Sequence, residues 1–153
     1  GLGRMPSLAH LSLRKSNLKG TVPSTLGQLD GLVGLDLGKN ALEGNIPTEL
    51  GRLSLLGDLK LDRNQLVGKV PTELGKLENL QTLDLQRNEL TGTIPAELGN
   101  LEKAESLKLQ TNQFVGDVPD SICDLQRRGG DLELEIYVDC DVSCSCCRSL
   151  SQC

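Results

Sequence analysis

The stretch LDLQRNELTGTIPAELGNL, from Leu83 to Leu101, has leucines that fit neither the period of an amphipathic helix nor the alternation of a strand for more than a few residues. Compared with itself at successive offsets, the sequence shows one dominant period of 24 residues. Five copies of the stretch line up, and they begin at Leu11, Leu35, Leu59, Leu83 and Leu107. The opening stretch is therefore one coil of a solenoid, whose leucines become buried only against the neighbouring coils.

Each copy begins with two leucines that alternate with polar residues, and this pattern predicts a short strand. Stacked coils would pair these strands in parallel, with one face pointing inward. An asparagine then recurs, and a carboxamide can bridge backbone groups of a bend that lacks ladder partners, because it both donates and accepts. This structural asparagine ladder comprises Asn40, Asn64, Asn88 and Asn112. The first coil has Ser16 at this position, so we expect a weaker first rung.

A glycine, a proline and a glutamate follow at fixed spacing. The glycine column, Gly20, Gly44, Gly68, Gly92 and Gly116, predicts positive φ or a close backbone approach. Proline three residues later suits the start of a helical turn, and glutamate two residues further lies where the positive end of a helix dipole favours it. Segments such as PTELG are therefore predicted to form one short helix or 3-10 turn.

The column set LxLxxNxLxGxIPxxLGxL resembles the plant-type leucine-rich repeat of receptor ectodomains, polygalacturonase inhibitors and many secreted plant and algal proteins, and the resemblance covers Leu2 to about Leu125. It implies an α/β repeat fold, a right-handed curved solenoid with a parallel sheet on the concave side. It also implies extended segments around LxGxIP and short helical or 3-10 turns on the convex side. The predicted division is residues 1–125, leucine-rich repeats with a partial first coil, and residues 126–153, a capping strand and Cys-rich disulfide segment.

The chain begins inside a coil, because LGRMPSL at residues 2–8 aligns one period before LGQLDGL. Plant-type members of the family usually carry a cysteine pair and an aromatic residue before the first repeat, and neither is present here. We therefore expect a piece of a longer polypeptide or assembly whose upstream coils are missing. The alternative is a short natural form with a frayed start.

At the other end the period fails after Leu125, and Leu132, Leu134, Ile136 and Val138 alternate with polar residues, which predicts a last strand. All six cysteines lie in the final thirty-one residues. Two interpretations compete: a disulfide-stapled cap, or a thiolate cluster for a soft metal. No histidine or paired Cys-x2-Cys spacing joins the cluster, so we favour disulfides and predict no metal site. The predicted disulfide cysteines are Cys123, Cys140, Cys144, Cys146, Cys147 and Cys153.

The segment also resembles the C-terminal caps, with DC followed by CSCC, of algal leucine-rich repeat proteins. The pairing stays open, since six cysteines allow 15 connectivities. Disulfides predict an oxidising compartment, either extracellular or along the secretory lumen.

Composition narrows the classes of function. With no Trp, one Tyr and one Phe, the core must come almost entirely from Leu, Val and Ile. The net charge of −5 disfavours non-specific binding to nucleic acid or to an anionic membrane. No apolar run approaches the ~18 residues of a membrane span, so we expect no membrane insertion within this segment.

The sequence does not predict an enzyme, a catalytic residue or a cofactor. His10 is the only histidine, and no nucleophile is identifiable beside it. Asp36 and Asp84 share a sheet column at roughly 9.6 Å, about the spacing of an inverting glycosidase pair. However, Lys60 lies between them and no aromatic platform is evident. The column continues as Lys108 and Glu133, so its alternating charges are predicted to neutralise one another along the sheet.

Binding is the remaining class, because the concave face offers an extended surface. The residue before the asparagine column is Lys15, Lys39, Arg63, Arg87 and then Thr111, a line of four cations at the edge of the sheet. This line is either a solubilising rim or a site for an anionic partner. The candidate partner-binding residues are Arg14, Lys15, Asp36, Lys39, Lys60, Arg63, Asp84, Arg87 and Lys108.

The sequence therefore predicts a protein-interaction module of an extracellular or lumenal leucine-rich repeat protein. Its expected partner is a protein, a peptide or an acidic glycan, bound through the concave face and its basic edge. The alternative is a structural scaffold subunit of a larger assembly, docked through its uncapped N-terminal end or its flank. Fold analogy alone does not choose between these two uses.

Overall fold

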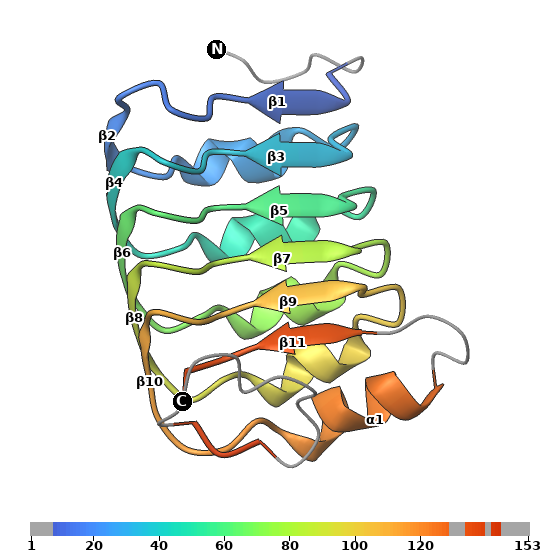
Figure 1. The fold of residues 1–153 in the computed structure, drawn as a ribbon. Helices are drawn as coiled ribbons and strands as arrows, with labels where there is room; N and C mark the ends of the chain where they lie inside the picture. The colour runs from blue at the N-terminus through green and yellow to red at the C-terminus, as the bar shows by residue number, and fades with distance from the viewer. Residues whose placement is uncertain (1–7, 129–133, 140–141, 145–153) are drawn as a thin grey trace.

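The structure is a computed structural model that describes residues 8–128, 134–139 and 142–144. Its coils stack into a solenoid, as the repeat predicts (Figure 1). One strand from each coil joins a parallel sheet in the order β1-β3-β5-β7-β9-β11. These strands are β1 (His10–Ser12), β3 (Gly34–Asp36), β5 (Asp58–Lys60), β7 (Thr82–Asp84), β9 (Ser106–Lys108) and β11 (Glu135–Tyr137). The exposed side of this sheet is the concave face.

A second parallel sheet lies along one flank, in the order β10-β8-β6-β4-β2. Its strands are β2 (Lys19–Thr21), β4 (Ala41–Gly44), β6 (Gln65–Gly68), β8 (Glu89–Gly92) and β10 (Gln113–Phe114). They are the extended segments implied around LxGxIP. The glycine column lies at or just beyond their ends with φ between 74° and 86°. The predicted positive φ is therefore confirmed, and a side chain at these positions would be strained.

The convex side carries one short helical turn per coil. Four are 3-10 helices: η1 (Ser24–Gln28), η2 (Thr48–Arg52), η3 (Thr72–Lys76) and η4 (Ala96–Asn100). The last coil has an α-helix instead, α1 (Asp120–Arg128). Each 3-10 helix begins directly after the proline of its coil, whose fixed φ suits a helix start.

A second glycine column, which the sequence analysis did not interpret, lets these turns approach one another. A Cβ atom on Gly27, Gly51 or Gly75 would overlap the backbone carbonyl of a glutamate in the next coil. The three carbonyls belong to Glu49, Glu73 and Glu97. Glycine at this position therefore sets the spacing of the convex side.

The interior is an aliphatic stack, as the composition predicts. In one central coil Leu50, Leu53, Leu56, Leu59 and Leu61 are all 0 % exposed. Phe114 is the aromatic residue of the buried core within the described residues. Because each leucine contacts its counterparts in adjacent coils, burial here is a property of the stack and not of one repeat.

The expected last strand is β11, which pairs in parallel with β9. Its register differs from the expected column, because Tyr137 and not Glu133 lies opposite Lys108. Ile136 pairs with Leu107, a separation of 29 residues where the repeat has 24. The longer α1 turn absorbs the extra residues. Assigning Glu133 to the charged column was therefore wrong, and Glu133 itself lies outside the described residues.

The carboxylate of Asp139 caps the final coil. Its two oxygens accept hydrogen bonds from the backbone nitrogens of Thr111 (2.6 Å) and Asn112 (3.0 Å), groups that would otherwise face a missing coil. Cys123 and Cys144 are each disulfide-bonded. Cys140, Cys146, Cys147 and Cys153 lie outside the described residues, so their pairing stays a prediction. The predicted boundary between residues 125 and 126 falls within α1, and the two-part division also stays a prediction.

Candidate functional site

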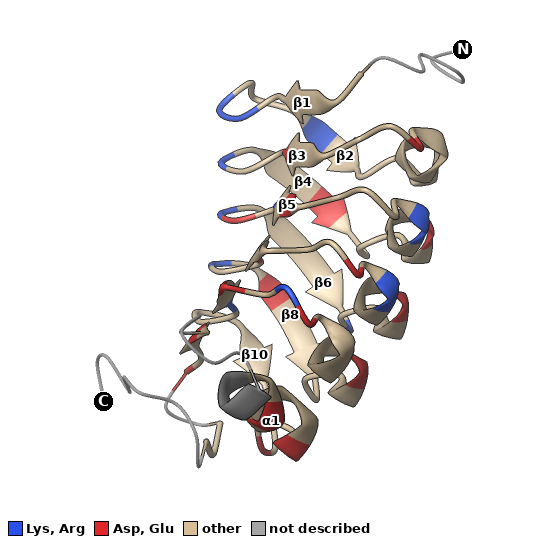
Figure 2. Cartoon of the chain, turned by 90° about the vertical axis from the view of Figure 1, so that its right-hand side faces the viewer, with Lys and Arg blue, Asp and Glu red and all other residues tan. Residues whose placement is uncertain are grey.

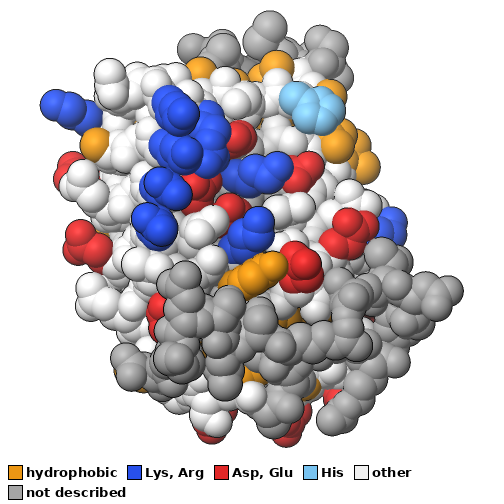
Figure 3. Space-filling model, in the orientation of Figure 1, with side chains coloured by type: hydrophobic (Ala, Val, Ile, Leu, Met, Phe, Trp, Pro, Cys, Tyr) orange, Lys and Arg blue, Asp and Glu red, His pale blue; other side chains and the backbone are white. Residues whose placement is uncertain are grey.

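The concave face is divided into columns, because strand register repeats from coil to coil. The central column of outward side chains reads Ser12, Asp36, Lys60, Asp84, Lys108 and Tyr137. Toward the carboxyl ends of the strands the next column is Arg14, Gly38, Asp62, Gln86 and Gln110. Figure 3 shows this face, with Lys and Arg side chains gathered beyond the strand ends.

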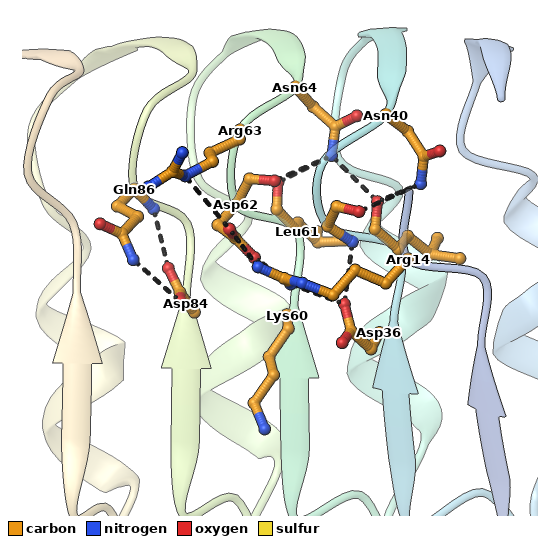
Figure 4. Close-up of polar contacts among 12 residues, drawn as sticks. Arg14, Asp36, Asn40, Lys60, Leu61, Asp62, Arg63, Asn64, Asp84 and Gln86 are labelled. Carbon is orange, nitrogen blue, oxygen red and sulfur yellow. Dashed lines mark hydrogen bonds and ion pairs between the residues drawn. The ribbon is translucent and has the colours of Figure 1, made fainter. Parts of the chain in front are cut away.

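Arg14 crosses two coils to reach Asp62. Its Nη1 and Nη2 donate to the two oxygens of Asp62 at 2.7 and 2.8 Å, and Nη1 also donates to Asp36 at 3.1 Å (Figure 4). We call this group the Arg14 clamp. The bidentate hydrogen bonds to Asp62 raise the pKa of Arg14 above its ordinary value. The Asp62 side chain is only 2 % exposed, so its charge depends on this partner.

Gly38 makes the clamp sterically feasible. It lies in the coil between Arg14 and Asp62, and a Cβ at this position would overlap both Arg14 Nη1 and Asp62 Oδ1. Gly38 and Asp62 are both buried, although they lie in a column on the concave side of the sheet. The sequence carries a signal for this contact, because Arg14, Gly38 and Asp62 follow one another at the 24-residue spacing, with glycine between opposite charges.

The alternating charges of the central column do not pair with one another, contrary to the prediction. Lys60 contacts Asp58 of its own strand, with Nζ and Oδ1 3.1 Å apart, and Asp36 is held by Arg14. Asp84 accepts hydrogen bonds from the backbone nitrogen and Nε2 of Gln86 at 3.3 and 3.1 Å. For each of these charged residues, the contacting partner lies in a neighbouring column and not at the same column position on the adjacent strand.

Asp84 is 8 % exposed, although the sequence analysis placed it on the exposed face. Burial raises the pKa of Asp84 above its ordinary value, and the hydrogen bond from Gln86 opposes this rise. Gln86 in turn accepts from Gln110 Nε2 at 3.2 Å. A chain of amides thus extends this column toward the last coil.

Tyr137 corrects the expectation that the face has no aromatic platform. It is half-buried beside Lys108, whose Nζ lies 6.0 Å from the ring centroid. The Tyr137 hydroxyl donates to Glu135 at 3.0 Å, and this hydrogen bond raises the pKa of Tyr137. The register shift of β11 brings the ring here, so the 24-residue spacing alone did not reveal it.

The asparagine ladder holds the turns that follow the strands. Asn88 Nδ2 donates to Leu61 O of the preceding coil (3.1 Å) and to Leu85 O of its own coil (3.0 Å), and Asn88 Oδ1 accepts from Leu66 N (3.1 Å). Asn64 and Asn112 make the corresponding bonds. Asn40 accepts from both Ser16 N and Leu18 N at the first coil. Each rung therefore ties two coils together at one turn.

The basic edge, defined as Lys15, Lys39, Arg63 and Arg87, occupies these same turns. All four residues have positive φ, between 55° and 57°, and Thr111 continues the series at 61°. Their backbone nitrogens extend the sheet ladder by donating to the next coil at distances from 2.8 to 3.1 Å. Figure 2 shows the basic turns stacked along one edge of the solenoid. The sequence predicted the column of charge but not its left-handed backbone.

The basic edge is poorly neutralised within the described residues. Arg63 Nε lies 4.0 Å from Asp62 Oδ2, a distant contact to a carboxylate that Arg14 already holds. The described contacts include no hydrogen bond or ion pair for the side chains of Lys15, Lys39 and Arg87. Repulsion from Lys15 and Arg63 lowers the pKa of Lys39. The edge is thus a strip of positive potential on a chain of net charge −5.

Among the hollows of the described surface, two differ in place and in size. The one on the concave face, about 140 Å³, is lined by residues that include His10, Asp36 and Lys60. The larger one, about 630 Å³, lies between η3 and η4 and is lined by both signs of charge, including Lys76 and Glu102. The larger hollow is remote from the basic edge and the Arg14 clamp, so size alone does not identify the site.

The described part shows neither a cluster of metal ligands nor a membrane-spanning helix. Across residues 8–128, 134–139 and 142–144, no three His, Cys, Asp or Glu side chains are grouped as metal ligands. No helix within those ranges is long and apolar enough to cross a bilayer.

Family models described as leucine-rich repeat match residues 6–66 and 79–101. No curated protein matches the chain. The plant peptide hormone receptor RGFR1, solved in complex with RGF2, has a TM-score of 0.82 and 35 % identity, covering 94 % of this chain and 22 % of that one. The Arabidopsis receptor kinase HAESA, solved with the peptide hormone IDA and the co-receptor SERK1, has a TM-score of 0.81 and 33 % identity, covering 90 % and 23 %.

The BIR3–SERK2 complex from Arabidopsis thaliana has a TM-score of 0.73 and 32 % identity, covering 91 % of this chain and 73 % of that one. The chain spans less than a quarter of the RGFR1 and HAESA chains, 22 % and 23 %. These likenesses agree with the strand, asparagine and glycine columns described above. The chain belongs to the plant-type leucine-rich repeat family.

Proposed function

We propose that this chain is part of an extracellular surface that binds a protein or peptide partner through the concave face and the basic edge, and that it is not an enzyme. The peptide hormone receptor RGFR1 was solved in complex with RGF2, and HAESA with the peptide hormone IDA, which supports a peptide-binding role for this fold. The two carboxylates of the glycosidase-like spacing are already engaged, Asp36 by Arg14 and Asp84 by Gln86. Hydrogen bonds within the chain therefore occupy both carboxylates.

The observation that carries the proposal is the left-handed backbone of the basic edge. A side chain at positive φ costs roughly 1 kcal/mol, and glycine or asparagine relieves that strain. Stability therefore favours glycine or asparagine at these turns, yet four consecutive turns carry Lys or Arg. Mutual repulsion adds to the cost. Lys and Arg occupy these turns despite the backbone strain and despite their mutual repulsion. This supports recognition of an anionic group more than a purely structural role.

The binding residues divide into two kinds under this proposal. Lys15, Lys39, Arg63 and Arg87 present charge to the partner, and Lys60 and Lys108 with Tyr137 offer contacts on the concave face. Arg14, Asp36 and Asp84 act mainly as internal partners that keep acidic charge away from the edge. An acidic protein or peptide segment is the partner that this layout fits best.

The test is selection of random linear peptides displayed on phage against the chain. Selected peptides are expected to be rich in Asp and Glu. Their binding is expected to weaken about ten-fold or more in Lys39→Glu/Arg63→Glu/Arg87→Glu, since each exposed ion pair contributes a modest amount and reversal replaces attraction by repulsion. Lys19→Glu/Arg52→Glu/Lys76→Glu is the matched control, because it changes net charge equally at exposed positions away from the edge.

Equal weakening in both variants would mean that only net charge matters. Unchanged binding in the edge variant would refute recognition through the basic edge. The scaffold and acidic-glycan alternatives then become the functions to test, by assembly state in solution and by binding of uronic acid oligomers.

A further inference from the structure

The basic edge is a rigid array with one cation per coil. The backbone nitrogens of Lys15, Lys39 and Arg63 donate to the next coil at 3.1, 2.8 and 2.9 Å, which locks these turns to the spacing of the sheet. Parallel strands are about 4.8 Å apart, so the charges repeat at about that distance along the solenoid axis. Figure 2 shows that the turn tips stand clear of the sheet edge. A partner that lies along the axis can therefore contact all four cations.

The spacing discriminates between conformations of an acidic partner. An extended strand places side chains of one face about 6.7 Å apart, so it loses register by about 1.9 Å per coil and by more than one whole coil over the edge. An α-helix rises about 5.4 Å per turn, which differs from the coil spacing by about 0.6 Å. Over the three steps from Lys15 to Arg87 the mismatch is about 1.8 Å, which flexible Lys and Arg side chains absorb.

The neighbouring carboxylates compete only weakly for these cations, through the 4.0 Å contact between Asp62 and Arg63. Asp36 and Asp62 are held by Arg14, and Asp84 is buried and hydrogen-bonded to Gln86. The concave face thus leaves the edge available to external carboxylates. The Arg14 clamp acts here as a positioning device, because it takes the hydrogen bonds of both Asp62 oxygens and leaves Arg63 with only a distant contact of 4.0 Å to this carboxylate.

We propose that the basic edge binds an acidic α-helix of a partner protein, aligned with the solenoid axis and facing one carboxylate to each coil. Acidic residues at i, i+4, i+7 and i+11 of that helix meet Lys15, Lys39, Arg63 and Arg87 in turn. The inference rests on the proposed function and deepens it by specifying the conformation and register of the partner. Tighter binding of a polyanion of another chemical class, such as a uronic acid oligomer, is one of the outcomes of the test.

The probes are three fluorescent peptides of equal length and equal net charge, with four glutamates each. The first is a side-chain-stapled helix with the glutamates at i, i+4, i+7 and i+11, the second is a stapled helix with them spread around its circumference, and the third is unstapled and broken by proline. Titrations followed by anisotropy are run at about 0.1 M salt. The Debye length there is about 10 Å, close to the helix diameter, so glutamates on the far side are screened.

The in-phase helix is expected to bind about four-fold or more tighter than either other peptide, since four exposed ion pairs each contribute at least about 1.4-fold. The advantage is expected to vanish in Lys39→Asn/Arg63→Asn/Arg87→Asn, where asparagine tolerates positive φ and keeps the turn. It is expected to persist in the matched control Lys19→Gln/Arg52→Gln/Lys76→Gln. That pattern would support the helical partner.

Three other outcomes overturn it in distinguishable ways. If all three peptides bind equally and all lose binding in the edge variant, the helical register is wrong while the proposed function stands. If none depends on the edge residues, both proposals fail. If a uronic acid oligomer of equal charge binds more tightly than the in-phase helix and depends on the same residues, the partner is a glycan and not a helix.

Discussion

Replacing Asn88 by alanine leaves the backbone nitrogen of Leu66 without its hydrogen-bond partner. It also removes one of two donors from the carbonyls of Leu61 and Leu85, which keep the hydrogen bonds from Asn64 and Asn112. Asn88 itself is 8 % exposed, so water reaches the vacated position poorly. A buried backbone group left unpaired costs about 1–3 kcal/mol. The two weakened carbonyls add a smaller loss, and we expect the free energy of unfolding to fall by about 2–4 kcal/mol.

Asn40→Ala is the matched control, because Asn40 makes similar bonds at the first coil, where Ser16 N and Leu13 O are exposed. Water can replace the carboxamide there, so we expect a loss of only about 1–2 kcal/mol. Urea denaturation followed by circular dichroism gives both values. Amide hydrogen exchange at Leu66 supplies a local readout, since its protection is expected to fall in Asn88→Ala.

Asn88→Asp tests the direction of the bonds. The carboxylate still accepts from Leu66 N but repels the carbonyls of Leu61 and Leu85, so the pKa of the new aspartate is expected to rise above its unfolded value. The protonated acid can donate, so the variant is expected to be most stable at low pH and to lose stability as pH rises through the folded pKa. A loss below about 1 kcal/mol in Asn88→Ala, or equal losses in Asn88→Ala and Asn40→Ala, would refute the ladder as a buried tie between coils.

Other predictions concern glycine and aspartate. Gly51→Ala forces a Cβ onto the carbonyl of the next coil and is expected to lower stability by about 2–3 kcal/mol, whereas Gly57→Ala, whose Cβ has no neighbour closer than 3.6 Å, is expected to stay within about 0.5 kcal/mol in urea denaturation. Gly38→Ala is expected to lower the free energy of unfolding by about 2–4 kcal/mol, because the added Cβ pushes Arg14 away from the buried carboxylate of Asp62. Adding Asp62→Asn is expected to recover part of that loss, because it removes the unpaired charge. If stability does not recover, the loss does not arise from the buried charge. Burial raises the pKa of Asp84, so its ionisation costs stability as pH rises through that folded pKa. Asp84→Asn is therefore expected to raise stability at about pH 7 and to lose this advantage near pH 3. A stability difference between Asp84→Asn and the parent chain that stays constant over this pH range would argue against this explanation.

Much of the fold was predictable because its determinants are local and repeated. Leu59 and Leu83 are read as core positions from their spacing alone, and both are 0 % exposed. A carboxamide at Asn64 bonds to the nearest backbone groups of its own turn and of the preceding coil, which any stack of similar coils supplies. Five copies of one pattern leave little freedom for another arrangement.

The candidate site was less predictable because charge pairing depends on distances across coils. Asp36 was expected to pair with Lys60 on the adjacent strand, but Arg14 reaches it from another column. Periodicity cannot report such diagonal contacts, since it records only which residues share a column. The left-handed turn at Lys39 was also hidden, because lysine gives no sign of positive φ.

The sequence by itself determined the solenoid, its concave parallel sheet, the inward leucines and the positive φ of glycines such as Gly68, because each follows from residue type and a fixed repeat. Only the tertiary structure decided that Arg14 reaches Asp62 over Gly38 and that Tyr137 lies beside Lys108. The first depends on a missing Cβ that opens a path between coils. The second depends on the extra residues of α1, which shift the last strand out of the repeat register.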